Sequence, residues 1–552
     1  MAVVAYVSYR KTRGEVSTQD GYFLAGRGLG PTFIAGSLLL TNLSAEQLIG
    51  LNGSAYGFNM SSMAWEVTAA VATIAMAFVF LPRYLSGAFT TLPQFLSERF
   101  DDSVRRMTVV LFMLGYGLVT IPSVLYSGSI AVLQLFNLPT MLGLAYGPTL
   151  VLTIIGIGCV GAVYAVFGGL RAVVISDTLN GIGLLIIGVA VPLLGLAALG
   201  EGSVLDGMGK LATNHPEKLN AIGGAEDPTP FGTLFTGMLI ANLFYWCTNQ
   251  YVIQRVLGAR DLAAGQKGVL LSGFFKVLVP FLMMIPGVIA YHLYGPKLAS
   301  IDLAYPRLIS DVLPVYAMGF FLAVLLGAVF SSFNSLLNSA ATLFCLDIYA
   351  PLRRTPLSDR QMVRTAKVAS VVIALFSFAI APLLQFAPIG LWQIIRIFTG
   401  FYNIPVIAIV VVGLFTRNVP ASAAKLVIVT HVIAYGLFQF VLKKHIDIHF
   451  LHLYAILFVA EVGIMLIMGR LTPHSKAPVV KPHNLVDMTP WRYARPCAVT
   501  LFSCVVALYL LFSPIGLAGG PGQTLALSLA ALVALNIGCW LWYRQNYAGA
   551  AA

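Results

Sequence analysis

Ala328, Ser331 and Ser332 have the residue types and the spacing of a cation site. At i, i+3 and i+4 they share one face of a helix, which brings a backbone carbonyl region and two hydroxyl groups together. A polar stretch around Leu40 to Leu43 interrupts an apolar segment, and unwound backbone there would free further carbonyl oxygens. Neutral oxygen ligands of this kind suit a hard monovalent cation, and broken membrane helices hold Na+ in this way. The alternative is that the two serines only help helices pack.

A second set of polar residues is suited to a solute rich in hydroxyl groups. Amides and carboxylates hydrogen-bond to such hydroxyls, and an aromatic ring can lie against the face of a sugar. The sequence offers groups of this kind within apolar segments, at Gln47, Glu66, Asn242, Tyr245 and Lys276.

Asp177 is a carboxylate just inside an apolar segment, where a charge is costly and therefore a candidate for function. Asn334 and Ser335 follow Ser331 on a neighbouring helix face and could complete a second cation site with it. A structural aspartate that caps a helix end is the open alternative.

These residues must be positioned by membrane helices. Of the 552 residues, 58% are hydrophobic and 10% are charged, whereas a soluble domain has about 25% charged residues. The net charge of +12 comes from basic residues scattered singly through short loops, which is typical of positive-inside topology and not of a nucleic-acid surface. Fourteen segments are apolar and of spanning length, near residues 32–56, 62–86, 106–135, 149–167, 175–200, 230–254, 268–292, 316–347, 366–387, 390–415, 421–442, 449–469, 496–513 and 523–543.

Two of these segments carry polar interruptions, at Leu39–Gly50 and at Ala241–Tyr251. Each interruption begins a block of five segments, and because five is odd the second block enters the membrane from the opposite side. This pattern predicts an all-α polytopic protein with a 5+5 inverted-repeat core and a solute site at the two breaks. The predicted parts are a partial N-terminal helix and cytoplasmic loop (1–31), a first repeat (32–200), an extracytoplasmic loop (201–229), a second repeat (230–415) and peripheral C-terminal helices (416–552).

Several sequence motifs together resemble the sodium:solute symporter family, in particular its sodium/glucose (galactose) cotransporter branch. The resemblance runs over roughly residues 20–415 and rests on Gly21–Arg27, Asn42–Gln47, Gly168–Val173, Tyr245–Gln250 with Gln254 and Arg255, and Ser331, Ser332, Leu337–Ser339 and Asp347–Tyr349. It implies a LeuT-like fold and sodium-coupled import of a sugar or sugar-like solute across the plasma (inner) membrane.

The resemblance also implies roles for individual residues. Sodium would be held by the carbonyls of Leu40, Leu43 and Ala328 and by the side chains of Ser331 and Ser332, with Asp177 on the sodium exit path or in a second sodium site. Gln47, Glu66, Asn242, Tyr245 and Lys276 match the family's sugar-binding residues. Tyr245 matches an inner gate, and Leu51, Trp65 and Trp392 match an outer hydrophobic gate.

Two positions depart from the family pattern. Ala69 stands where the family has a serine, and Arg396 stands where it has a glutamine, with Gln393 one turn earlier as a possible replacement amide. A permanent guanidinium at membrane depth needs a partner. Either Glu66 pairs with Arg396, or the solute brings negative charge, or Arg396 snorkels to the cytoplasm. Lys276 competes with Arg396 as the partner of Glu66.

The sequence favours transport over other functions. It contains no phosphate-binding loop, no His/Glu metal cluster and no nucleophile elbow, so we expect no enzyme. The six cysteines lie in apolar segments and imply neither a disulfide framework nor a zinc site. The expected partners are sodium, a small solute and the lipid bilayer, with no nucleic acid. The alternatives are symport of an anionic sugar, a carboxylate or an amino acid, proton coupling through Asp177, or a solute sensor that does not transport.

Overall fold

The structure is a computed structural model. It describes residues 18–353, 355–386, 391–446, 448–473, 483 and 485–547, apart from the side chains of 45, 134, 164–168, 391–394, 397, 444 and 547. In these residues twelve helices are long and apolar enough to cross a membrane, and a bent helix pair makes a thirteenth span. The predicted segment 230–254 is the fourteenth, and it consists of two short helices instead of one. The start of the predicted N-terminal helix, residues 1–17, lies outside the described residues.

The helices of the first half begin and end as follows: α2 Gln19–Leu24, α3 Pro31–Asn42, α4 Ala45–Gly57, α5 Ala64–Ala75, α6 Leu81–Ser86, α7 Leu92–Arg99, α8 Asp102–Gly115, α9 Ile121–Phe136, α10 Leu138–Leu142, α11 Tyr146–Leu199 and α12 Val204–Thr213. Those of the second half are α13 Gly237–Cys247, α14 Gln250–Leu257, α15 Leu262–Met283, α16 Ile285–Tyr294, α17 Ala304–Val312, α18 Val315–Leu343, α19 Ala350–Leu352, α20 Asp359–Ile380, α21 Leu391–Phe415, α22 Ala421–Phe440, α23 Phe450–Leu471, α24 Ala494–Leu511 and α25 Gln523–Tyr547.

Both predicted interruptions are breaks in the helices. The axes of α3 and α4 differ by 60°. At this break the N–H of Ser44 donates to the Asn42 carbonyl at 3.0 Å, in place of the Leu40 carbonyl four residues back. In the second break, the N–H groups of Thr248 and Asn249 both donate to the Phe244 carbonyl, at 2.9 and 3.0 Å, before α14 begins.

The predicted segments near 149–167 and 175–200 are two spans in the structure, Tyr146–Val163 and Gly169–Leu199, which together carry the label α11. The backbone of Gly169 has φ 57° and ψ −170°, which is accessible essentially only to glycine. This non-helical residue separates the two spans.

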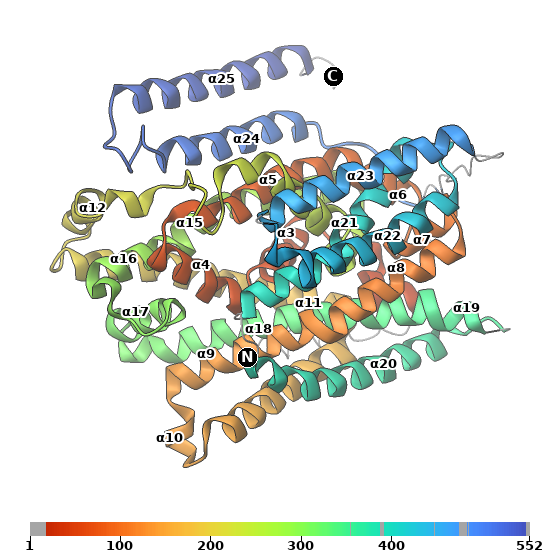
Figure 1. The fold of residues 1–552 in the computed structure, drawn as a ribbon, viewed down its shortest axis with the longest axis horizontal. Helices are drawn as coiled ribbons and strands as arrows, with labels where there is room; N and C mark the ends of the chain where they lie inside the picture. Colours follow the sequence, from red (N-terminus) through yellow and green to blue (C-terminus); the bar gives the residue numbers. More distant parts are fainter. Residues whose placement is uncertain are drawn as a thin grey trace.

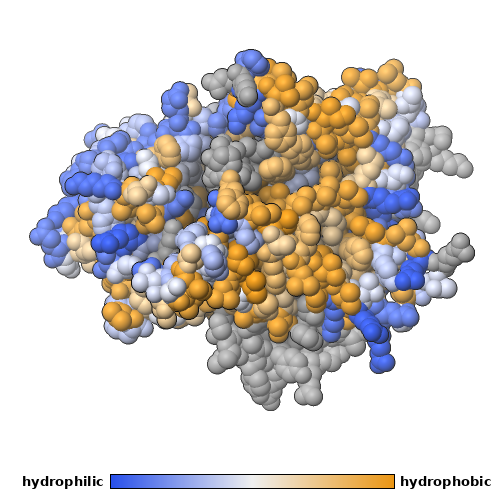
Figure 2. Space-filling model, turned by 60° about the horizontal axis from the view of Figure 1, so that its bottom comes forward, coloured by the Kyte–Doolittle hydropathy of each residue, from blue (hydrophilic) through white to orange (hydrophobic). Residues whose placement is uncertain are grey.

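The broken helices lie among the long spans. Helix α3 packs against α11 and α15, and α13 packs against α5, while α18 packs against α11. Figure 1 shows α24 and α25 stacked along one edge of the bundle, outside the other helices. Figure 2 shows hydrophobic residues across the middle of one face and hydrophilic residues toward its ends, as expected of a protein that spans a bilayer.

Candidate functional site

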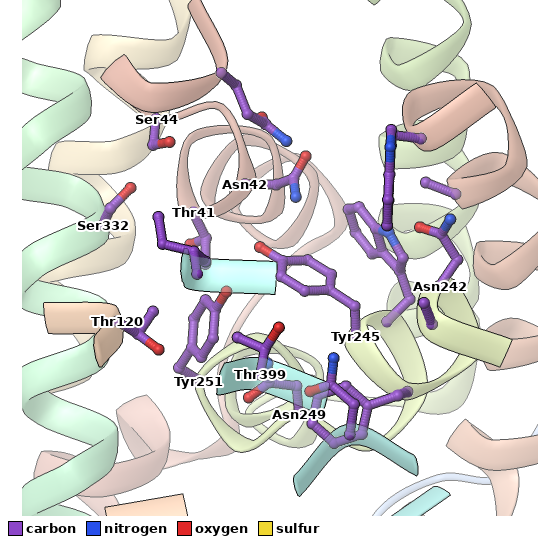
Figure 3. Close-up of a pocket in the computed structure, with 18 of the residues that line it drawn as sticks. Thr41, Asn42, Ser44, Thr120, Asn242, Tyr245, Asn249, Tyr251, Ser332 and Thr399 are labelled. Atoms are coloured by element: carbon purple, nitrogen blue, oxygen red, sulfur yellow. The ribbon is translucent and has the colours of Figure 1, made fainter. Parts of the chain in front are cut away.

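A cavity of about 120 Å³ lies where the two broken helices meet α5, α9, α18 and α21. Its lining includes four predicted solute residues, Gln47, Glu66, Asn242 and Tyr245, together with Arg396, Trp65 and Ser332. Figure 3 shows the ring of Tyr245 pointing into the middle of this group, with Thr41, Asn42 and Ser44 from the first break on one side and Asn242 on the other. The cavity therefore brings together residues that are up to about 350 positions apart in the chain.

Glu66 is paired with Lys276, which decides between the two cations that the sequence left open. The ammonium of Lys276 contacts the Glu66 carboxylate, and both side chains are buried, with exposed fractions of 1% and 3%. The second Glu66 oxygen accepts a hydrogen bond of 2.9 Å from the amide nitrogen of Gln47. Because a carboxylate only accepts, this bond fixes the amide orientation of Gln47 and turns its oxygen toward other donors.

The oxygen atoms without a partner around the cavity are three amide oxygens, which only accept hydrogen bonds, and two hydroxyls, which also donate. These five buried side-chain oxygens of its lining have no hydrogen-bond partner among the described residues: Thr41 Oγ1, Asn42 Oδ1, Gln47 Oε1, Ser332 Oγ and Asn403 Oδ1. Buried polar groups are normally satisfied. A ligand that donates several hydrogen bonds would complete this set.

Tyr245 belongs to a layer of tyrosines beneath the cavity. Its ring makes an edge contact with Tyr251 at 5.7 Å between centroids, and Tyr251 makes one with Tyr116 at 5.7 Å. Tyr116 contacts Tyr402 at 6.5 Å and donates a hydrogen bond to Asn249 in the second break. The layer joins four different helical elements.

The predicted sodium residues lie where α3 and α18 pack together. The hydroxyl oxygens of Ser331 and Ser332 are buried without a hydrogen-bond partner among the described residues. Figure 3 shows Ser332 on the same side of the cavity as Ser44. The Leu40 carbonyl does not receive the N–H of Ser44, as described above. Leu40, Leu43 and Ala328 are fully buried.

Asp177 lies next to this cluster and belongs to a network. One carboxylate oxygen accepts a 2.6 Å hydrogen bond from Ser37, and the same oxygen lies 4.0 Å from Arg255. The Arg255 guanidinium also bonds to Ser37, at 2.9 Å, and to the hydroxyl of Ser335. The other Asp177 oxygen and Asn334 Oδ1 have no partner among the described residues, and the Ser331 hydroxyl faces Asp177. Ser335 is therefore engaged by Arg255, whereas Asp177 and Asn334 each keep an oxygen for a cation.

Arg396 has a partner that the sequence did not suggest. Its guanidinium carbon lies 3.8 Å from the centroid of the Trp65 ring, a cation–π geometry. Both residues line the cavity and also a second chamber of about 510 Å³, which includes Leu51, Glu226 and Lys443. Glu226 belongs to the loop 201–229, so Arg396 shares this chamber with the loop that the sequence predicts to be extracytoplasmic.

The stacked pair of Arg396 and Trp65 forms the partition between the two chambers. Leu51 lies on the wall of the outer chamber, next to Trp65. The third predicted outer-gate residue, Trp392, has a side chain that lies outside the described residues.

The cavity also contains polar residues that the sequence did not single out. Glu46 lies beside the Ser127 hydroxyl, at 3.4 Å, and Thr399 and Asn403 face the cavity from α21. Asn242 donates to Thr68 at 2.8 Å, so a hydroxyl on α5 orients that amide. The i, i+3 and i+7 spacing of Arg396, Thr399 and Asn403 marks one helix face and was the available signal.

Comparison with known proteins agrees with this geometry. The family model of the sodium:solute symporter family matches residues 22–429. An uncharacterized symporter of Escherichia coli strain K12, YidK, is 43% identical over 92% of this chain and 88% of its own length. The sodium/glucose cotransporter of Vibrio parahaemolyticus is 31% identical over 77% of this chain and 80% of its own.

Among solved structures, a Na+-coupled sialic acid symporter in a substrate-bound outward-open state superimposes with a TM-score of 0.74. The match covers 86% of this chain and 97% of the other at 20% identity, which establishes a common fold. We conclude that the chain belongs to the sodium:solute symporter family, with Na+ as its co-transported ion.

Proposed function

We propose that the chain imports a polyhydroxylated, sugar-like solute together with Na+ across the plasma membrane by alternating access, and that it has no enzymatic activity. The observation that carries this proposal is the set of three unpartnered amide oxygens around the cavity, at Asn42, Gln47 and Asn403, which can only accept hydrogen bonds. Several hydroxyl groups on one solute would donate to them, whereas a simple carboxylate offers acceptors only. The names of the similar glucose and myo-inositol cotransporters support the same solute class.

In this proposal Gln47 and Glu66 bind solute hydroxyls from the outer end of the cavity, and Asn242 and Tyr245 bind from the second break. Lys276 holds the Glu66 carboxylate in place. Tyr245 is the inner gate, and Trp65 with Leu51 and Trp392 forms the outer gate. Binding of solute and of Na+ are linked because the first break contributes to both sites.

The sodium site would consist of the Ser331 and Ser332 hydroxyls with the carbonyls of Leu40, Leu43 and Ala328. Asp177 with Asn334 would lie on the sodium exit path or form a second site, next to the Ser335 hydroxyl that Arg255 engages. The two serine hydroxyls have no partner among the described residues and lie on α18, which packs against the first broken helix. This supports the assignment, since neutral oxygens at such breaks bind Na+.

An anionic sugar is the second candidate, and Arg396 favours it. The guanidinium lines the cavity, and it can leave the Trp65 face to meet a carboxylate bidentately. The acceptor oxygens would then bind the hydroxyl groups of the same molecule.

Counterflow in proteoliposomes tests both candidates. Uptake of labelled D-galactose, D-glucose, D-galacturonate and D-glucuronate is measured in Na+ and in K+, on the wild type and on Arg396→Gln. We expect uptake of one sugar class that requires Na+. Selective loss of uronate uptake in Arg396→Gln would assign the anionic sugar. Binding without exchange would identify a sensor, uptake of amino acids alone would overturn the solute class, and equal uptake in K+ would overturn sodium coupling.

A further inference from the structure

The helices that follow the second repeat are bonded to the backbone of α21 next to Arg396. The hydroxyl of Tyr454, on α23, donates to the carbonyl oxygen of Arg396 at 2.8 Å. One turn further along, His431 Nε2, on α22, lies 3.0 Å from the carbonyl oxygen of Gly400. Two side chains from outside the 5+5 core therefore hold a single turn of the helix that carries the guanidinium.

His431 and Glu461 form a buried polar pair, and their hydrogen bonds indicate how many protons the pair carries. A carbonyl only accepts, so Nε2 must carry a hydrogen. The other ring nitrogen, Nδ1, lies 2.5 Å from Glu461 Oε1 on α23, and one shared proton between these atoms completes both hydrogen bonds. The pair is then neutral as a whole. Its side chains have exposed fractions of 0% and 4%, so a neutral pair avoids the cost of an isolated charge at membrane depth.

The packing around Gly400 is tight. The rings of His431 and Tyr435 stack, with centroids 5.5 Å apart and planes 13° from parallel. A Cβ placed on Gly400 would lie 2.3 Å from the Tyr435 hydroxyl oxygen. Pro405 follows within the same helix and has no N–H to offer to the Phe401 carbonyl. This part of α21 lacks one of its own hydrogen bonds and receives two from its neighbours.

We propose that Tyr454, His431 and Glu461 are positioning residues for Arg396: they fix the turn of α21 from Arg396 to Gly400 and thereby set the direction of the guanidinium toward the Trp65 face and the cavity. The proposal rests on the proposed function, because it assumes that Arg396 contributes to solute selection. In that case the peripheral helices α22 and α23 contribute to solute selectivity, although they do not line the cavity themselves.

A double-mutant comparison tests the proposal. Tyr454→Phe removes one hydroxyl. The sugars to measure are those, among the four named above, whose affinity changes in Arg396→Gln. For these sugars we expect Tyr454→Phe to lower the affinity about 2- to 10-fold, which corresponds to the loss of one hydrogen bond. In the Arg396→Gln background the same change should have no further effect, because the guanidinium that it positions is gone. Tyr56→Phe, on α4, is the control. It also loses a hydroxyl that donates to a backbone carbonyl, that of Gly295 at 2.6 Å, and in addition a bond from the Leu298 N–H at 3.2 Å. Additive losses would overturn the proposal.

The His431 pair has a test of its own. Glu461→Gln can still donate a hydrogen bond to Nδ1 and should keep near-normal selectivity, whereas Glu461→Ala should shift it in the direction of Arg396→Gln. Equal effects of the two substitutions would contradict the assigned geometry.

If none of the four sugars binds, the proposed solute is refuted, but the positioning of α21 is not. Amide hydrogen exchange tests that positioning without any solute. Tyr454→Phe and Glu461→Ala should each raise exchange in residues 396–404 at least several-fold without changing α13, while Tyr56→Phe should leave both segments unchanged. Unaltered exchange in 396–404 would show that no such positioning exists.

Discussion

Removing Lys276 should destabilise the protein far more than removing both members of its ion pair. In Lys276→Met the Glu66 carboxylate stays buried and loses the ammonium that contacts it, while the amide of Gln47 still donates to it. Breaking a buried ion pair by removing one partner costs about 3–5 kcal/mol, which corresponds to roughly 100-fold or more in the folding equilibrium. The double variant Glu66→Gln, Lys276→Met removes both charges, and most of that loss should be recovered.

The assay is thermal inactivation of the detergent-purified protein in Na+, followed by uptake of the four sugars in proteoliposomes. Lys276→Met should inactivate at a markedly lower temperature, and the double variant should approach the wild type. Uptake should stay low in the double variant because Gln47 loses the carboxylate that orients its amide. Lys210→Met is the control: it breaks the exposed pair with Glu201 and should leave the inactivation temperature unchanged. A double variant as unstable as the single one would refute the reasoning.

Three further predictions follow from the same structure. Ser332→Ala should raise the Na+ concentration for half-maximal uptake roughly 10-fold, and an unchanged Na+ dependence would remove Ser332 from the sodium site. Gly400→Ala should lower thermal stability because its Cβ meets Tyr435, whereas Gly463→Ala, which faces open space, should not. Burial and the neighbouring His452 lower the pKa of His449, at the start of α23, below the ordinary 6.5. Stability should therefore be complete above pH 6.5 and decline as the pH falls through the folded-state pKa, and thermal scans of His449→Gln should show a flatter profile.

Hydropathy and the polar interruptions were sufficient to predict the spans and both breaks. The pairing of Glu66 was not predictable, because Lys276 and Arg396 lie on separate helices whose rotation depends on packing against distant segments. The stacking of Arg396 on Trp65 was missed for the same reason. A guanidinium needs a partner, but the sequence does not say that an aromatic face supplies it.

The polar residues of α21 were harder to recognise. Thr399 and Asn403 stand singly in an apolar segment, where a threonine or asparagine often bonds to its own backbone, as Thr399 does to the Arg396 carbonyl at 3.2 Å. The two spans near 149–167 and 175–200 were predicted, but the sequence did not show that a single non-helical residue, Gly169, separates them.

Among the described side chains, one stacked pair, Arg396 and Trp65, lines both chambers, whereas the tyrosine layer joins four helical elements. Rotation of a side chain takes nanoseconds, while displacement of packed helices takes microseconds to milliseconds. A solute in the cavity would therefore exchange with the outer chamber many times before the inner side opens once. On this reasoning the apparent affinity for solute on the outer side approaches an equilibrium dissociation constant. The transport rate is then set by the opening of the tyrosine layer.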